Sequence, residues 1–161
     1  MLAARDPRAR GILGTEVRPV RGHVARVETR VEAPPERVWQ VLTDPEPRPE
    51  VMFGARTVTE WQVGGPIRWQ GEWEGRVFED KGEVLVVDPP RRLVVTHWSP
   101  LGGRPDEPDA YHELAFLLEP ADGGTRVELT QDNNPTPEAA EHSRAMWASM
   151  LEGVRALSEA G

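Results

Sequence analysis

The chain has 161 residues, no cysteine and a formal net charge of −8 at pH 7. This length fits one domain, and the lack of cysteine excludes disulfides, thiolate metal ligands and a cysteine nucleophile. The acidic balance argues against a nucleic-acid-binding surface. No apolar run approaches the ~20 residues of a membrane span, and no signal peptide is recognisable. We therefore expect a cytoplasmic domain.

Residues 1–21 are predicted to form a partly disordered N-terminal extension, ahead of a folded domain over residues 22–161. Met1–Arg10 is basic and lacks apolar periodicity, which is typical of a solvated tail. Part of Ile12–Val20 either extends the first strand or pairs beside it. That first strand, predicted at His23–Glu32, alternates apolar and polar residues and so has one buried face.

A short helix is predicted over Ala33–Glu46. Two prolines open it, where a missing N–H costs little because the first helical N–H groups have no partner within the helix. Thr43-Asp44-Pro45 ends it, since proline restricts the residue before it. Pro47 and Pro49 then leave room for at most a short second helix.

The middle of the chain predicts antiparallel strands, because apolar and polar residues alternate between turn signals. The turns are Gly64-Gly65-Pro66, Glu74-Gly75 and Ala121-Asp122-Gly123-Gly124. With the first strand, this makes about seven strands in all. The further strands are expected at Arg56–Val63, Ile67–Trp73, Val77–Val87, Leu93–Trp98, Tyr111–Glu119 and Thr125–Gln131.

A long closing helix is predicted from Pro137, with Thr136 as its N-cap. Apolar residues recur at spacings of three and four from Ser143 to Leu157, which makes a stripe wide enough to lie across a sheet. The order of a short helix, strands and a long helix predicts an α+β helix-grip fold. In that fold a curved antiparallel sheet, here of about seven strands, surrounds the C-terminal helix, often with a cavity between them.

These segments together resemble the START-like (SRPBCC) superfamily, and within it the domain named after the activator of the heat-shock ATPase. The resemblance spans roughly Val24 to Ser158. It is carried by APPERVWQVLTDPE, VGGPIRWQ, GEVLVVDPPRRLVVTHW, FLLEPADGGTRVELT, and Trp147, Leu151 and Leu157 of the last helix. It implies a sheet gripping a helix around an apolar pocket. Superfamily members include lipid carriers, hormone receptors, polyketide cyclases and a eukaryotic co-chaperone. They share no catalytic motif, so the resemblance identifies no catalytic residue.

Two histidines form the first candidate site, because each shares the parity of three apolar neighbours on its own predicted strand. If both apolar faces point inward, a symmetric hairpin register places His97 directly opposite His112. The two histidines are then a half-exposed pair at the rim of the sheet that forms hydrogen bonds with water or the backbone, a polar anchor for a ligand, or part of a metal site. A metal ion needs a third ligand, and the adjacent Glu113 lies on the opposite face. We therefore predict no metal and no cofactor.

Aromatic and methionine side chains form the second candidate site. Such residues either make up a plain core or line an adaptable apolar pocket. Asp80 shares the parity of Phe78 and Val84, but we expect a bulge in the strand to turn it outward. The residues predicted to bound a cavity are Trp69, Trp73, His97, His112, Phe116, Met146, Trp147 and Met150.

The chain contains no Gly-x-Ser-x-Gly elbow, no phosphate-binding Gly-rich loop with lysine and no His-Glu-x-x-His pair. The leading hypothesis is therefore the binding of a small apolar molecule in a cavity between the sheet and the last helix. One alternative is a cyclase- or hydrolase-type enzyme that uses the cavity histidines. Another is a co-chaperone-like protein-interaction module. The pattern leaves open the identity of the ligand and whether the chain forms a homodimer.

Overall fold

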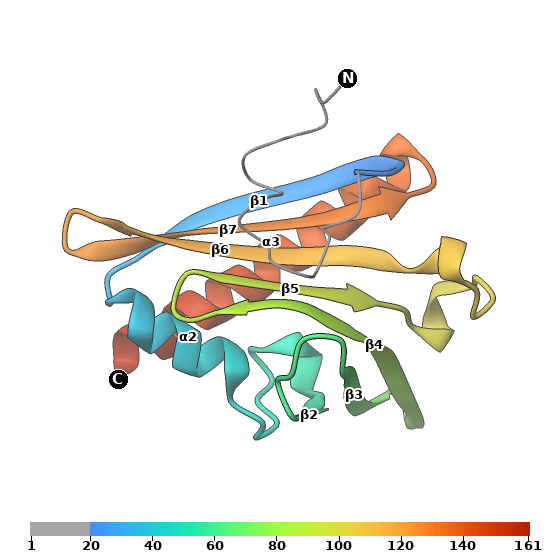
Figure 1. Ribbon diagram of the computed structural model, residues 1–161, viewed down its shortest axis with the longest axis horizontal. Coiled ribbons are helices and arrows are strands. Elements are labelled where there is room, and N and C mark those ends of the chain that lie inside the picture. The colour runs from blue at the N-terminus through green and yellow to red at the C-terminus, as the bar shows by residue number, and fades with distance from the viewer. Residues whose placement is uncertain (1–19) are drawn as a thin grey trace.

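The computed structural model describes residues 20–161. The predictions for residues 1–19, which include the disorder of the extension, lie outside this range. Seven strands form one antiparallel sheet in the order β1-β7-β6-β5-β4-β3-β2, which confirms the predicted α+β sheet (Figure 1). The strands are β1 His23–Val31, β2 Arg56–Thr59, β3 Pro66–Trp73, β4 Arg76–Asp88, β5 Arg92–His97, β6 His112–Ala121 and β7 Gly124–Asn134.

Within residues 20–161, two α-helices and three short 3₁₀ helices accompany the sheet. Figure 1 shows α3 running behind the sheet, and α2 lies beside the C-terminal part of α3. The first helix is shorter than predicted and ends before Asp44-Pro45, because the residue preceding a proline leaves the helical region. The helices are α2 Pro35–Thr43, α3 Pro137–Ala160, η2 Met52–Gly54, η3 Pro100–Gly102 and η4 Pro108–Ala110.

The closing helix begins as its sequence predicts. The hydroxyl oxygen of Thr136 accepts a hydrogen bond of 3.0 Å from the Ala139 N–H, and Pro137 is the first helical residue. Capping satisfies an N–H group that has no partner within the helix. The apolar stripe faces the sheet, and its buried members are Ala140, Trp147, Met150, Leu151, Val154 and Ser158.

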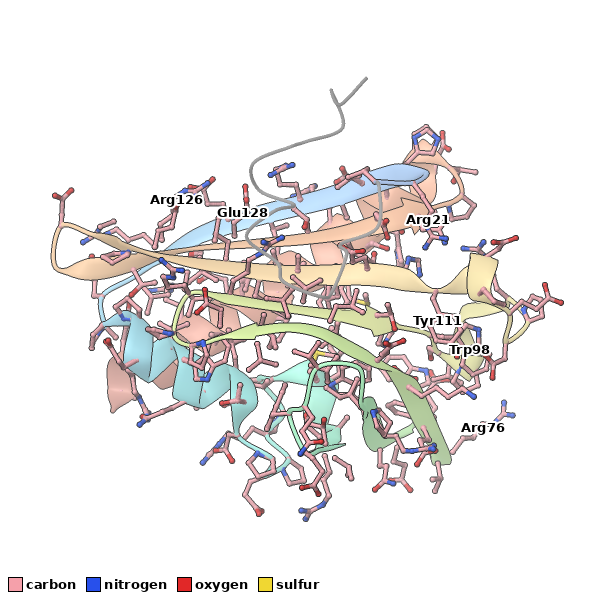
Figure 2. All side chains as sticks on the ribbon, viewed as in Figure 1. Arg21, Arg76, Trp98, Tyr111, Arg126 and Glu128 are labelled. Atoms are coloured by element: carbon pink, nitrogen blue, oxygen red, sulfur yellow. The ribbon has the colours of Figure 1, made fainter. Side chains whose placement is uncertain are left out.

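The main core lies between the inner face of the sheet, α2 and α3. On the outer face, which is turned toward the viewer in Figures 1 and 2, a small apolar cluster contains Leu85, Val86 and Val94. Arg126 and Glu128 belong to an ion-pair network on this face (Figure 2). Pairs this exposed contribute little to stability. The inner face therefore holds the fold together and is the place to look for a site.

Candidate functional site

The inner face of the sheet is apolar along most of α3 but carries polar side chains at one end. Its polar part, called the polar end below, consists of Asp80, His97, His112, Gln131 and Trp147. It lies beside the N-terminal half of α3, since α3 starts shortly after β7 ends at Asn134 and its Trp147 ring lies 6.5 Å from that of His97 on β5. The sheet itself positions four of these residues, because each shares the parity of buried apolar residues on its own strand.

The two histidines lie directly opposite each other in the β5–β6 register, as predicted. Their ring centroids are 6.4 Å apart and the ring planes are inclined by 30°. The ring of His97 also lies 5.0 Å from Trp69 of β3 and 6.5 Å from Trp147 of α3, measured between centroids. His97, which is 9% exposed, therefore sits between an aromatic ring of the sheet and one of the helix.

A carboxylate orients the ring of His97. The Oδ2 atom of Asp80 lies 2.9 Å from His97 Nε2, and both side chains are nearly buried. The expectation that a bulge turns Asp80 outward is wrong. The irregularity in β4 lies between Val84 and Val86, beyond Asp80, so Asp80 keeps the inward parity of Val84.

This contact fixes which nitrogen of His97 is free. A carboxylate accepts hydrogen bonds, so Nε2 of a neutral ring carries the proton and Nδ1 presents a lone pair. Both His97 Nδ1 and Asp80 Oδ1 are buried and have no hydrogen-bond partner among the described residues. The same is true of Trp147 Nε1 and Gln131 Oε1. Buried polar atoms are nearly always paired, and an unpaired one costs about 1–3 kcal/mol.

The second histidine is held by the backbone. Its Nδ1 lies 2.7 Å from the carbonyl oxygen of Asp132, which can only accept, so Nδ1 carries the proton. Burial lowers the pKa of His112 below its ordinary value of 6.5, and the nearby His97 lowers it further, against the opposing effect of the Asp132 carbonyl. A neutral His112 therefore offers Nε2 as a further acceptor near pH 7.

Most of the predicted cavity residues lie in the core. Trp69 and Phe116 are each 4% exposed, Trp147 and Met150 are buried against them, and Met146 is half-buried beside the same cluster.

Trp73 departs from this set. It is 56% exposed and pairs with Arg76 at the tip of the β3–β4 hairpin. It has the parity of Trp69 on β3, but at the hairpin tip little of the protein covers its ring.

One aromatic neighbour of the polar end was not predicted. The ring of Phe53 lies 5.8 Å from that of Trp147, and Phe53 has a positive φ of 56°, which is unusual for a bulky residue. Its loop packs closely on α3, because a Cβ added at Gly153 would lie 2.6 Å from the carbonyl oxygen of Glu50. No sequence signal marked Phe53. Gln131 was also missed, although its parity with Val127 and Leu129 on β7 would have identified it.

Two surface hollows lie elsewhere and include none of the predicted residues. One of about 490 Å³ lies between α2 and the end of α3, where Arg37 donates to the Leu157 carbonyl. The other, of about 440 Å³, lies on the outer face beside Tyr111. Burial of Tyr111 and its hydrogen bond to Asp106 raise the pKa of this residue to about 12. In Figure 2 Trp98 lies close to Tyr111, and their rings stack at 6.4 Å. Arg37 and Tyr111 therefore already have hydrogen-bond partners within the protein.

Within residues 20–161, no three histidine, aspartate or glutamate side chains are arranged to hold a metal ion. No helix in the described part of the chain is long and apolar enough to cross a membrane. The longest, α3, carries charged residues along its exposed side.

The sequence matches the model of one protein family over residues 32–159, described as activator of Hsp90 ATPase homolog 1-like protein. No curated protein sequence matches the chain. The solution structure of ChR145 from Cytophaga hutchinsonii is 42% identical over 86% of this chain and 94% of its own, with a TM-score of 0.72. A Rhodobacter sphaeroides protein is 30% identical over 89% and 95%, with a TM-score of 0.63. The Aha1 dimer from Colwellia psychrerythraea, 21% identical over 85% and 96% with a TM-score of 0.66, shares the fold.

Proposed function

Because this chain belongs to the family of activator of Hsp90 ATPase homolog 1-like proteins, we propose that it binds a small, largely hydrophobic molecule between its sheet and α3. The observation that carries the proposal is the set of four buried polar atoms without partners at the polar end. A core that served stability alone would gain by replacing them with carbon. A ligand with a small polar group would pair them and offset their cost.

The surroundings of these atoms suit such a ligand. Binding sites for small molecules combine apolar and aromatic walls with a few converging polar groups that fix orientation. Trp69, Phe116 and Trp147 supply wide apolar surfaces, and Met146 and Met150 supply side chains that adapt to different shapes. We propose these five residues, with His97 and His112, as the ligand contacts.

The test is native mass spectrometry of the purified protein, followed by solvent extraction of any retained molecule. We expect the wild-type protein to retain a small organic molecule, and expect the Trp69→Ala variant to lose it. Trp73→Ala is the matched control, because this ring is largely exposed at the hairpin tip, and it should retain the molecule. A wild-type protein that retains nothing, and binds none of the aromatic compounds tested below, would contradict the proposal.

A second candidate function is an enzyme of cyclase or hydrolase type. The Asp80–His97 pair favours it, because a carboxylate that fixes one imidazole nitrogen leaves the other free to act as a general base. In this role His97 Nδ1 would take a proton from the bound molecule or from a water beside it. Once the retained molecule is known, conversion by the wild type and loss of conversion with retained binding in His97→Gln would support this candidate.

We also propose that the domain acts in the cytoplasm, since a chain without cysteine fits a reducing compartment. The Colwellia structure is described as a dimer, which motivates a homodimer here. Light scattering coupled to size-exclusion chromatography tests this assembly.

A further inference from the structure

The hydrogen-bonding capacity of the polar end is unbalanced. Gln131 Oε1, an amide oxygen, can only accept hydrogen bonds, and so can Asp80 Oδ1 when the carboxyl is ionised. His97 Nδ1 also accepts when the ring is neutral and its proton is on Nε2. Trp147 Nε1 is the one donor among these four unpartnered atoms. The complement of this set is a group that brings more donors than acceptors.

The charged residues near the polar end also favour a ligand group that is positively charged. Asp80 forms no ion pair with a lysine or arginine within residues 20–161, and its one partner is His97. Lys81, the next residue, lies on the outer face of the strand and pairs there with Asp106. The partner of this carboxylate is an imidazole, and a carboxylate with no lysine or arginine beside it is costly in a desolvated place.

Aromatic residues lie near this carboxylate, since Trp69 pairs with Asp80 in the β3–β4 register. The ring of Trp69 lies against His97, which contacts Asp80, and Phe53 lies against Trp147 on the helix side. The face of an aromatic ring attracts a cation, most strongly for tryptophan. Acceptors, a carboxylate without a lysine or arginine partner among the described residues, and aromatic rings therefore occur together.

We infer that the polar end selects a protonated amine on an apolar body. The ammonium group would donate to Asp80 Oδ1 and His97 Nδ1 and place a positive charge beside the carboxylate, while the apolar body packs against Trp69 and Trp147. This inference rests on the proposed function, because it names the ligand class of the same site. The exposed carboxylates of this acidic chain would draw a cation toward the protein, but they do not distinguish one cation from another.

The experiment compares three probes with the same naphthyl body, which are naphthylethylamine, naphthylacetate and naphthylethanol. Each is titrated into the full-length protein at neutral pH, with affinity measured by calorimetry and the Trp147 indole N–H followed by proton–nitrogen NMR. We expect the amine to bind at least about tenfold more tightly than the carboxylate, with the alcohol between them. This comparison uses the wild-type protein and so does not depend on whether a variant folds.

Two variants locate the preference. Asp80→Asn should reduce the affinity for the amine about tenfold and leave that for the alcohol nearly unchanged. Asp88→Asn is the matched control, because Asp88 is a more exposed aspartate of the same strand that pairs with Arg91, and it should keep the preference. Tighter binding of the carboxylate, or an amine preference that persists in Asp80→Asn, would overturn the inference and leave the proposed function standing. Failure of all three probes to bind would contradict the inference, and only together with a wild-type protein that retains no molecule would it contradict the proposed function as well.

Discussion

The two ends of the interface between sheet and helix follow the same rules of strand alternation and helix periodicity, yet they are built differently. Around the C-terminal half of α3, Leu151 and Val154 pack on Val31, Leu118 and Val127, and each of these side chains is at most 1% exposed. A single hydroxyl without a partner, that of Ser158, lies in this half of the helix. At the polar end four such atoms gather instead.

This difference separates what holds the protein together from what we propose it does. Burial of apolar side chains stabilises a fold by about 1.5–3 kcal/mol for each large residue, whereas each unpartnered polar atom costs about 1–3 kcal/mol. Natural proteins break the rules of stable packing mainly at functional sites. Changes at the apolar end should therefore alter stability, and changes at the polar end should alter binding.

The largest effect is expected for Trp147→Ala, since this ring belongs to both the core and the polar end. Removing a fully buried aromatic ring should lower the free energy of unfolding by about 3–5 kcal/mol, and Phe53 would lose its packing partner. Chemical denaturation measures the change. Trp73→Ala serves as the control and should cost less than about 1 kcal/mol. A similarly small loss for Trp147→Ala would show that this ring does not support the core.

A smaller loss of stability, with binding preserved, is expected for Leu151→Ala. The cavity left at the apolar end should cost about 2–4 kcal/mol. Because Leu151 is not among the proposed ligand contacts, the folded variant should bind the naphthyl amine as the wild type does, by calorimetry. An affinity more than about tenfold weaker would mean that the two ends are not separable.

Apolar replacement at the polar end should reduce stability only when it leaves one polar group of the Asp80–His97 pair without its partner. His97→Phe alone leaves Asp80 buried without its partner, so it should lower the free energy of unfolding by about 1–3 kcal/mol. The double variant Asp80→Leu with His97→Phe removes both groups and should recover most of that loss while the amine preference disappears. A double variant that is less stable than the single one would indicate that the pair is there for stability.

The smallest effect concerns pH. The pKa of His112 is lowered by burial, so below its ordinary value of 6.5 the unfolded chain takes up a proton before the folded protein does. Stability should therefore decrease as the pH falls from that value toward the lowered pKa, and return as the pH rises. Denaturation curves across this range measure the slope, which should be shallower in His112→Gln. An unchanged slope in this variant would contradict the role of His112.

Much of this arrangement follows from sequence patterns with a short period. Alternation along β5 and β6 predicted that His97 and His112 face each other, and the spacing along α3 predicted the burial of Trp147. Asp80 was misassigned because Val84 to Val87 is apolar at every position, so alternation cannot locate the bulge within it.

Other features have no local signal. The place of Phe53 depends on a loop with left-handed residues and on its contact with a distant helix. Trp73 is exposed because no other element within residues 20–161 packs over the tip of its hairpin, and the alternation of residues along a strand does not predict where such packing ends. The partners of buried polar atoms likewise depend on elements far apart in the chain.

The central claim is that the polar end receives the ligand. The most direct measurement follows the indole N–H signal of Trp147, assigned with Trp147→Phe, while naphthylethylamine is added to the full-length protein. We predict that this signal shifts to saturation and that magnetisation transfers between it and the naphthyl protons, while amide signals of the apolar end around Leu151 and Val154 stay in place. A Trp147 signal that does not move while surface signals such as that of Trp73 do would contradict the claim.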